Sequence, residues 1–113
     1  MMSDTPDLDP TALARLRRLG GEQLVQQMVA LFLESTPQRL AAARTGEQQG
    51  NREAVTRAMH ALKSSAGNIG ALRLQDLASH LERTGKDLTR EAILRLLEEL
   101  EATFIRIKSQ FEA

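Results

Sequence analysis

The 113-residue sequence contains no cysteine, no tryptophan and no tyrosine, and its aromatic residues are three phenylalanines. Without cysteine the chain can form no disulfide, no thiol nucleophile and no cysteine-ligated zinc site. The sequence contains two histidines, too few to suggest a histidine-based metal centre. We therefore expect that this chain holds no metal ion.

An excess of charge of either sign is also missing, because fifteen basic residues balance fifteen acidic ones. Nucleic acids and anionic membranes call for a basic excess or patch, so we expect neither as a partner. No apolar run reaches the roughly 18 residues of a membrane span, and the N-terminus MMSDTPDLDP is too polar for a signal peptide. These absences predict a cytoplasmic protein, expected to be a monomer, whose binding is local and specific.

Common catalytic motifs are missing as well. The sequence shows no glycine-rich phosphate loop, no clustered pair of carboxylates and no Ser-His-Asp order. We therefore expect no nucleotide or cofactor site in this chain, and no kinase or ATPase activity of its own.

The pattern of apolar residues predicts helices throughout. Apolar side chains recur at three- and four-residue spacings, and no segment alternates with period two. Asp9 followed by Pro10 predicts the start of a short accessory helix, which should end at Gly20 and Gly21. The next helix should run from about Glu22 into the middle forties.

Two features in the middle of the chain bear on where the predicted helices begin and end. Pro37 lies inside the second predicted helix, where it removes a hydrogen bond and crowds the preceding turn, so we expect a kink there or a break near Thr36. Asn51, after Gly50, is a good N-cap for the next helix, which should end at about residues 67–68.

The last third of the chain predicts two more helices. One begins at about Ala71, keeps one apolar face and stops near Gly85. The other begins at Asp87 or Thr89 and stays amphipathic as far as Phe111. Each of these helices presents one apolar stripe to bury.

Four amphipathic helices with short connections favour an all-α fold, an antiparallel up-and-down four-helix bundle with a short accessory N-terminal helix. The length and the 42% hydrophobic content suit one domain with one core. We assign residues 1–7 to an N-terminal tail and residues 8–113 to the helical domain.

The candidate functional residues lie in the segment AMHALKSSAGNIGA, residues 58–71. At about 100° per residue, His60 lies opposite a stripe of small and apolar side chains. That stripe is formed by Ala54, Ala58, Ala61, Leu62 and either Ser65 or Ala66. The neighbours of His60 on the helical wheel are Glu53, Thr56, Lys63, Ser64 and Gly67. The surroundings of His60 are therefore polar or small, and open to a partner.

This segment resembles the signature of histidine-containing phosphotransfer (HPt) domains of two-component signalling. The matching positions are His60, Leu62, Lys63, Ser65, Gly67, Gly70, Ala71, Leu74 and the pair Leu81-Glu82. Comparable features elsewhere are Leu8-Asp9, Gly20-Gly21, Phe32-Leu33, Pro37 and Gly50-Asn51, so the resemblance covers almost the whole chain. Ser64 departs from the family, which usually has glycine there, and we expect it to narrow access to the imidazole slightly.

The resemblance implies a phosphorelay intermediate. His60 would accept a phosphoryl group from the phospho-aspartate of one receiver domain and pass it to the aspartate of another. A neutral imidazole is a good nucleophile, and Lys63 would supply a mobile ammonium that screens the roughly two added negative charges. Thr56, Ser64 and Gly67 would face the partner. Response-regulator receivers and a hybrid sensor histidine kinase are the implied partners, and the receiver would bring the Mg²⁺ ion.

Other interpretations remain open from the sequence. His60 and Lys63 can be read as ordinary surface residues, as we read His80, and Gly67 as a helix-terminal glycine. The chain can be a helical adaptor that binds and inhibits a receiver or kinase without carrying phosphate. It can also be the histidine-bearing module of a larger hybrid or chemotaxis kinase, although a start at Met1 favours a freestanding protein. A purely structural bundle is the fourth interpretation.

Overall fold

The computed structural model describes residues 5–112, and these residues form helices and no strand. The elements are α1 (Pro10–Gln48), α2 (Arg52–Ile69), α3 (Leu72–Thr84), the short 3-10 helix η2 (Gly85–Asp87) and α4 (Arg90–Glu112). The all-α prediction is confirmed. The short helix η2 was not expected from the sequence. The predicted tail, residues 1–7, falls partly outside the described residues.

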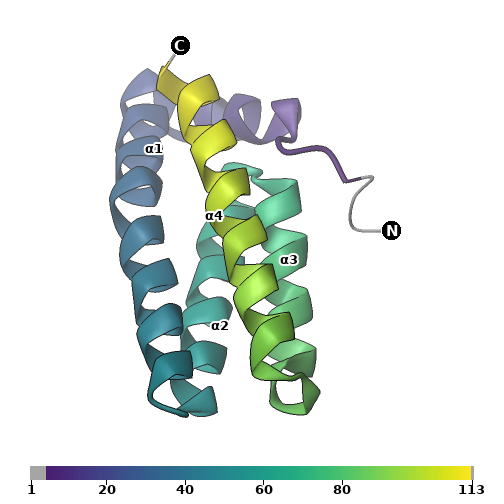
Figure 1. Ribbon diagram of the computed structural model, residues 1–113. Coiled ribbons are helices and arrows are strands. Elements are labelled where there is room, and N and C mark those ends of the chain that lie inside the picture. The colour runs from purple at the N-terminus through teal and green to yellow at the C-terminus, as the bar shows by residue number, and fades with distance from the viewer. Residues whose placement is uncertain (1–4, 113) are drawn as a thin grey trace.

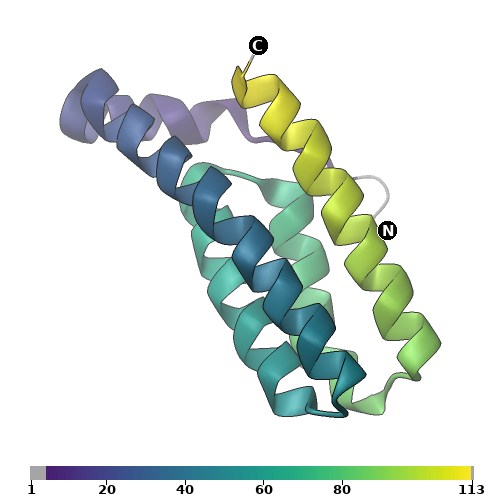
Figure 2. The same cartoon turned by 60° about the vertical axis from the view of Figure 1, so that its left-hand side comes forward.

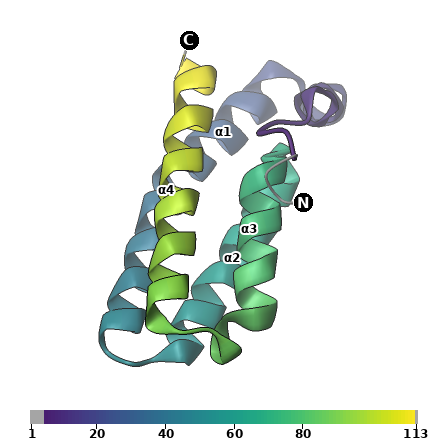
Figure 3. The same ribbon diagram turned by 45° about the vertical axis from the view of Figure 1, so that its right-hand side comes forward.

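The four long helices pack as an antiparallel bundle (Figure 1). Around the bundle α1 contacts α2 and α4, and α3 contacts the same two helices. The view in Figure 3 shows α4 running beside α1 and α3, with α2 behind them. Such an order follows from short connections, since each one turns the chain back along its predecessor.

Gly21 divides α1 into an accessory helix and a long bundle helix. Its dihedral angles, φ 73° and ψ −171°, lie outside the helical region, in a region that favours glycine because it has no Cβ atom. Figure 2 shows the resulting bend, beyond which the N-terminal segment crosses the end of the bundle. The accessory helix begins as expected, because the Asp9 side chain accepts a hydrogen bond from the Thr11 N–H.

The break that we considered near Thr36 is wrong. Within α1 the non-helical dihedral angles occur at Gly21, and the helix continues through Pro37. A proline forfeits one backbone hydrogen bond, but Phe32, Thr36 and Leu40 on either side are buried against the bundle. The helix therefore does not break at Pro37.

Both ends of α2 are capped. The Asn51 side chain accepts a hydrogen bond from the Ala54 N–H, as predicted. At the other end Gly70 is left-handed, with φ 77°, and its carbonyl accepts a hydrogen bond of 2.8 Å from the Asp9 N–H. The helix therefore runs to Ile69, slightly beyond the predicted end, and its C-terminus is tied to the start of the accessory helix.

The buried stripe of α2 differs slightly from the predicted one. Its buried members are Val55, Ala58, Met59, Leu62, Ala66 and Ile69. Ala54 and Ala61 are half-buried at the edges of this stripe. The larger side chains Val55 and Met59 turn the helix so that they fill the core, because burial of apolar area favours the bulkier residue.

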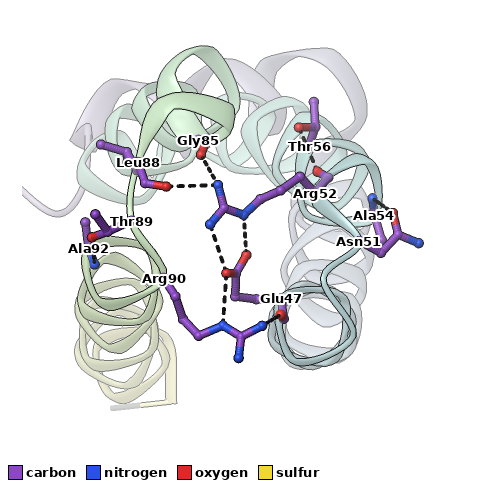
Figure 4. A network of polar contacts seen from close by, with 10 residues as sticks. All are labelled: Glu47, Asn51, Arg52, Ala54, Thr56, Gly85, Leu88, Thr89, Arg90 and Ala92. Atoms are coloured by element: carbon purple, nitrogen blue, oxygen red, sulfur yellow. Dashed lines mark hydrogen bonds and ion pairs between the residues drawn. The ribbon is translucent and has the colours of Figure 1, made fainter.

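One end of the bundle is closed by a buried ion network (Figure 4). Glu47 at the end of α1 is 2% exposed, and its carboxylate accepts from Arg52 Nε at 2.6 Å and Arg52 Nη2 at 3.0 Å. Arg52 also donates to the carbonyls of Gly85 and Leu88. Arg90 Nη2 donates to the Glu47 carbonyl at 2.9 Å. The network joins α1 and α2 to the connection between α3 and α4.

The start of the described chain also contacts the bundle. Thr5 donates a hydrogen bond to Asp76 on α3, and Asp7 pairs with Arg106 on α4 at 3.0 Å. At the other connection the Thr89 hydroxyl accepts from the Ala92 N–H, close to the predicted start of the last helix. No helix in the described part of the chain is long and apolar enough to cross a membrane.

Candidate functional site

His60 lies on the outer face of α2, with a side chain that is 65% exposed. The helix holds it there because its neighbours Met59 and Leu62 are fully buried in the core. The expectation that the imidazole faces away from the buried stripe is confirmed. A reacting group on a partner can approach the ring without displacing the bundle.

Glu82 on α3 fixes the orientation of this imidazole. Its Oε2 atom lies 2.7 Å from His60 Nδ1, and the Glu82 side chain is 18% exposed. His60 and Glu82 are 22 residues apart in the sequence, and they meet because α2 packs against α3. Sequence reasoning assigned no role to Glu82, although it belongs to the Leu81-Glu82 pair of the family signature.

Lys63 shares the same carboxylate. Its Nζ atom lies 2.6 Å from Glu82 Oε1, and its side chain is 33% exposed. The ammonium expected to be mobile is therefore paired in this structure, one helical turn from His60. Glu82 thus bridges the imidazole and the ammonium, one with each oxygen.

The electrostatics of the site keep Glu82 ionised. Its pKa lies below the ordinary value of a glutamate, chiefly because the Lys63 ammonium pairs with the carboxylate. Partial burial acts in the opposite direction, and the hydrogen bond from His60 adds to the lowering. An ionised carboxylate can only accept hydrogen bonds.

This pairing determines the tautomer of the imidazole. Because the Glu82 carboxylate accepts, His60 Nδ1 must carry the proton, which leaves the lone pair of the neutral ring on Nε2. The Nε2 atom is the ring nitrogen that faces away from Glu82. The arrangement resembles a nucleophile whose second nitrogen is held by an acidic group.

The three residues expected to face a partner differ in their surroundings. Ser64 is exposed and Thr56 is half-buried, with its hydroxyl donating to the Arg52 carbonyl. Gly67 is also half-buried, and a Cβ atom there would lie 2.7 Å from Gln75 Nε2 on α3. A side chain at Gly67 would therefore require the end of the flexible Gln75 side chain to move.

The described residues contain no group of three or more histidine, cysteine, aspartate or glutamate side chains that could hold a metal ion. Glu82 already has both oxygens engaged by His60 and Lys63. His80, the other histidine, is half-buried on α3. The geometry is that of an exposed nucleophile with a cation beside it.

Comparison with known proteins agrees with this geometry. The family model of the Hpt domain matches residues 27–108. The fold superposes on the crystal structure of histidine-containing phosphotransfer protein B (HptB) from Pseudomonas aeruginosa PAO1 with a TM-score of 0.87 and 25% identity, covering 96% of this chain and 94% of that one. A putative histidine-containing phosphotransfer protein from rice shares the fold, with a TM-score of 0.84 and 21% identity over 94% of this chain and 79% of that chain.

A search of curated proteins gives no match. The family model nevertheless covers most of the chain, including all of α2, all of α3 and most of α4. The matched region contains the exposed His60, the Glu82 carboxylate that contacts it, and Lys63, which shares that carboxylate. The chain therefore belongs to the Hpt domain family.

Proposed function

We propose that His60 is the phosphoacceptor, and that it takes a phosphoryl group from the phospho-aspartate of one receiver domain and gives it to the aspartate of another. As an Hpt domain the chain is a phosphoryl carrier in a phosphorelay and has no autonomous kinase activity. The observation that carries the assignment is the 2.7 Å contact between His60 Nδ1 and Glu82 on an otherwise exposed ring.

The chemistry of the step follows from the tautomer. The lone pair of Nε2 attacks the phosphorus atom in line, the Nε2–P bond forms, and the bond from phosphorus to the aspartyl oxygen breaks. The released carboxylate stays on the receiver. Because both ring nitrogens are then substituted, the ring gains positive charge while Nδ1 keeps its proton, and the Glu82 carboxylate stabilises that charge. Reversal of the same step loads the second receiver.

Lys63 would have two roles in this mechanism. Its ammonium holds one oxygen of Glu82, which orients the other toward the ring. Lys63 also adds positive charge one turn from the transferred group, whose oxygens carry roughly two negative charges. We assign the exposed face around Thr56, Ser64 and Gly67 to the receiver, which would supply the Mg²⁺ ion.

The same proposal includes the partners, the compartment and the oligomeric state of the protein. The partners would be response-regulator receivers and a hybrid sensor histidine kinase. The protein would act in the cytoplasm, and it would act as a monomer. Family membership supports receiver domains as partners in general.

Label transfer from a phosphorylated receiver tests the assignment. Receiver domains of the source organism are phosphorylated with labelled acetyl phosphate, freed of the donor and mixed with wild type, His60→Gln and His80→Gln. We expect label on wild type and His80→Gln but none on His60→Gln, with circular dichroism unchanged because the His60 side chain is exposed. Binding of a receiver by wild type without any transfer would support the inhibitory adaptor instead.

A further inference from the structure

An open groove between α1 and α2 adjoins the histidine face. It encloses about 420 Å³, and its lining includes the small residues Ala42, Ala54 and Ala58. Arg39 from α1 and Arg57 from α2 line the same groove. Since alanine side chains are short, the groove has room for a partner side chain near these two arginines.

The two groove arginines differ from the arginines of the described chain that pair with carboxylates. Six other arginines form ion pairs with carboxylates: Arg17, Arg44, Arg52, Arg73, Arg90 and Arg106. Neither Arg39 nor Arg57 makes a hydrogen bond or ion pair with any described residue. No carboxylate lines the groove. The groove thus presents two uncompensated positive charges in a protein whose overall charge is zero.

The position of the groove links it to phosphotransfer. Arg57 precedes His60 by three residues on α2, which places it about one turn away along the helix. A partner large enough to bring an aspartate to His60 Nε2 therefore also covers Arg57. At its other end the groove shares Ser35 and Arg39 with a second hollow that is lined by Leu31 and Phe32. Leu31 is 60% exposed.

We propose that this groove receives a carboxylate-bearing segment of the receiver domain, and that Arg39 and Arg57 select among receivers by charge. The proposal rests on the proposed function, since it concerns the partner of His60. Charge complementarity supports it, because the groove is lined by two unpaired guanidinium groups and by no carboxylate, so that it favours an anionic group on the partner. Unpaired cations on a docking surface raise the association rate of an acidic partner and disfavour a basic one.

Two double variants test this role. Arg39→Glu/Arg57→Glu reverses the charge of the groove, and Arg95→Glu/Lys108→Glu makes the same change in net charge on exposed, unpaired positions of α4. The partner is the receiver domain that transfers label to wild type, and its Kd is measured at low salt. We expect the groove variant to bind about tenfold more weakly and the α4 variant within about twofold of wild type. In about 1 M salt, where the Debye length is about 3 Å, the difference should largely vanish.

A second readout separates docking from chemistry. Phosphoramidate is a small donor whose N–P bond breaks as the Nε2–P bond forms, with ammonia leaving, and it needs no docking surface. We expect it to label the groove variant at the wild-type rate. Receiver binding by the groove variant at wild-type affinity, or an equal loss in the α4 variant, would overturn the proposal and leave His60 as the acceptor. Failure of phosphoramidate and receivers alike to label wild type would instead refute the proposed function.

Discussion

The Glu82 carboxylate contacts both side chains that the resemblance to phosphotransfer domains singles out. It reaches His60 with one oxygen and Lys63 with the other, at 2.7 Å and 2.6 Å. A surface imidazole without such a partner would rotate freely and exchange between its two neutral tautomers. The Glu82 contact therefore orients an exposed imidazole, as its proposed role as phosphoacceptor would need.

Replacing Glu82 with glutamine should impair transfer more than folding. In the proposed mechanism the amide removes the negative charge that would stabilise the phosphorylated ring, so we expect transfer from a receiver to slow roughly ten- to a hundredfold. The free energy of unfolding should fall by about 1 kcal/mol at neutral pH, because the ion pairs lost are near the surface. Stopped-flow transfer assays and urea denaturation measure the two effects.

The stability difference should also depend on pH. The pKa of Glu82 is lowered in the folded protein from an ordinary value of 4.5. Its contribution is therefore complete above that value and is lost as the pH falls through the lower folded pKa. The stability curves of wild type and Glu82→Gln should converge in acid. A constant difference across this range, together with wild-type transfer rates, would remove Glu82 from the mechanism.

Replacing Lys63 with alanine should have a smaller effect. The ammonium is one third exposed, and pairs of this kind contribute only about 0–1 kcal/mol. We expect severalfold slower transfer or a shorter phosphohistidine lifetime, followed by the decay of label on purified phosphoprotein. An unchanged rate and lifetime would make Lys63 a structural partner of Glu82 without a part in transfer.

The sequence was informative about His60 because exposure follows from helical periodicity within one segment. It gave no role to Glu82, because the contact joins two helices and depends on their relative rotation. That rotation is set by Val55 and Met59 in the core, which the predicted stripe omitted. Helical periodicity thus predicts which residues share one face of a helix. It does not predict which residue of a second helix contacts that face.

At the scale of the helices, the caps were the most predictable features. Asn51 and Asp9 cap their helices through contacts within three residues, so local chemistry determines them. The break considered near Thr36 was wrong because the consequence of an internal proline also depends on tertiary packing, and α1 is continuous at Pro37. Gly70 shows the same difference between local and tertiary features. Its left-handed conformation at the end of α2 is a local feature, but its contact with Asp9 joins segments far apart in the sequence.

Gly70 should tolerate alanine poorly. An added Cβ would collide with the Cβ of Ala12 and lie 3.1 Å from the Asp9 carbonyl oxygen. We expect the free energy of unfolding to fall by about 3 kcal/mol, from left-handed strain together with this overlap. Gly50→Ala provides the control, because Gly50 is also left-handed, with φ 69°, but has nothing within 4 Å of the added atom. Equal losses in the two variants, measured by urea denaturation, would show that the contact with the accessory helix contributes nothing.

At the scale of the whole molecule, the hydrogen bonds and ion pairs around Glu47 connect the helices at one end of the bundle. They join the end of α1 and the start of α2 to the connection between α3 and α4. A carboxylate that is 2% exposed would be costly without its partners. Arg52 supplies two hydrogen bonds to it and two more to the carbonyls of Gly85 and Leu88. Nothing in the composition distinguishes Glu47 from the exposed glutamates, so sequence reasoning could not find this network.

Replacing Arg52 with alanine should destabilise the bundle by about 3 kcal/mol, because it leaves a buried carboxylate with Arg90 alone. Arg17→Ala, which breaks an exposed pair with Glu22, should cost less than about 1 kcal/mol. Phosphoramidate labelling of folded Arg52→Ala should match wild type, since its contacts lie outside the site. Similar losses of stability in the two variants would contradict the structural role of the buried network.

The most direct measurement of the central claim locates the phosphoryl group on the protein. Wild type with ¹⁵N-labelled histidine is phosphorylated and examined by nuclear magnetic resonance for coupling between phosphorus and ring nitrogen. The contact between Glu82 and Nδ1 predicts coupling to Nε2 of His60, with Nδ1 still protonated and the His80 signals unchanged. Phosphorus on Nδ1 of His60, or on any other residue, would contradict it.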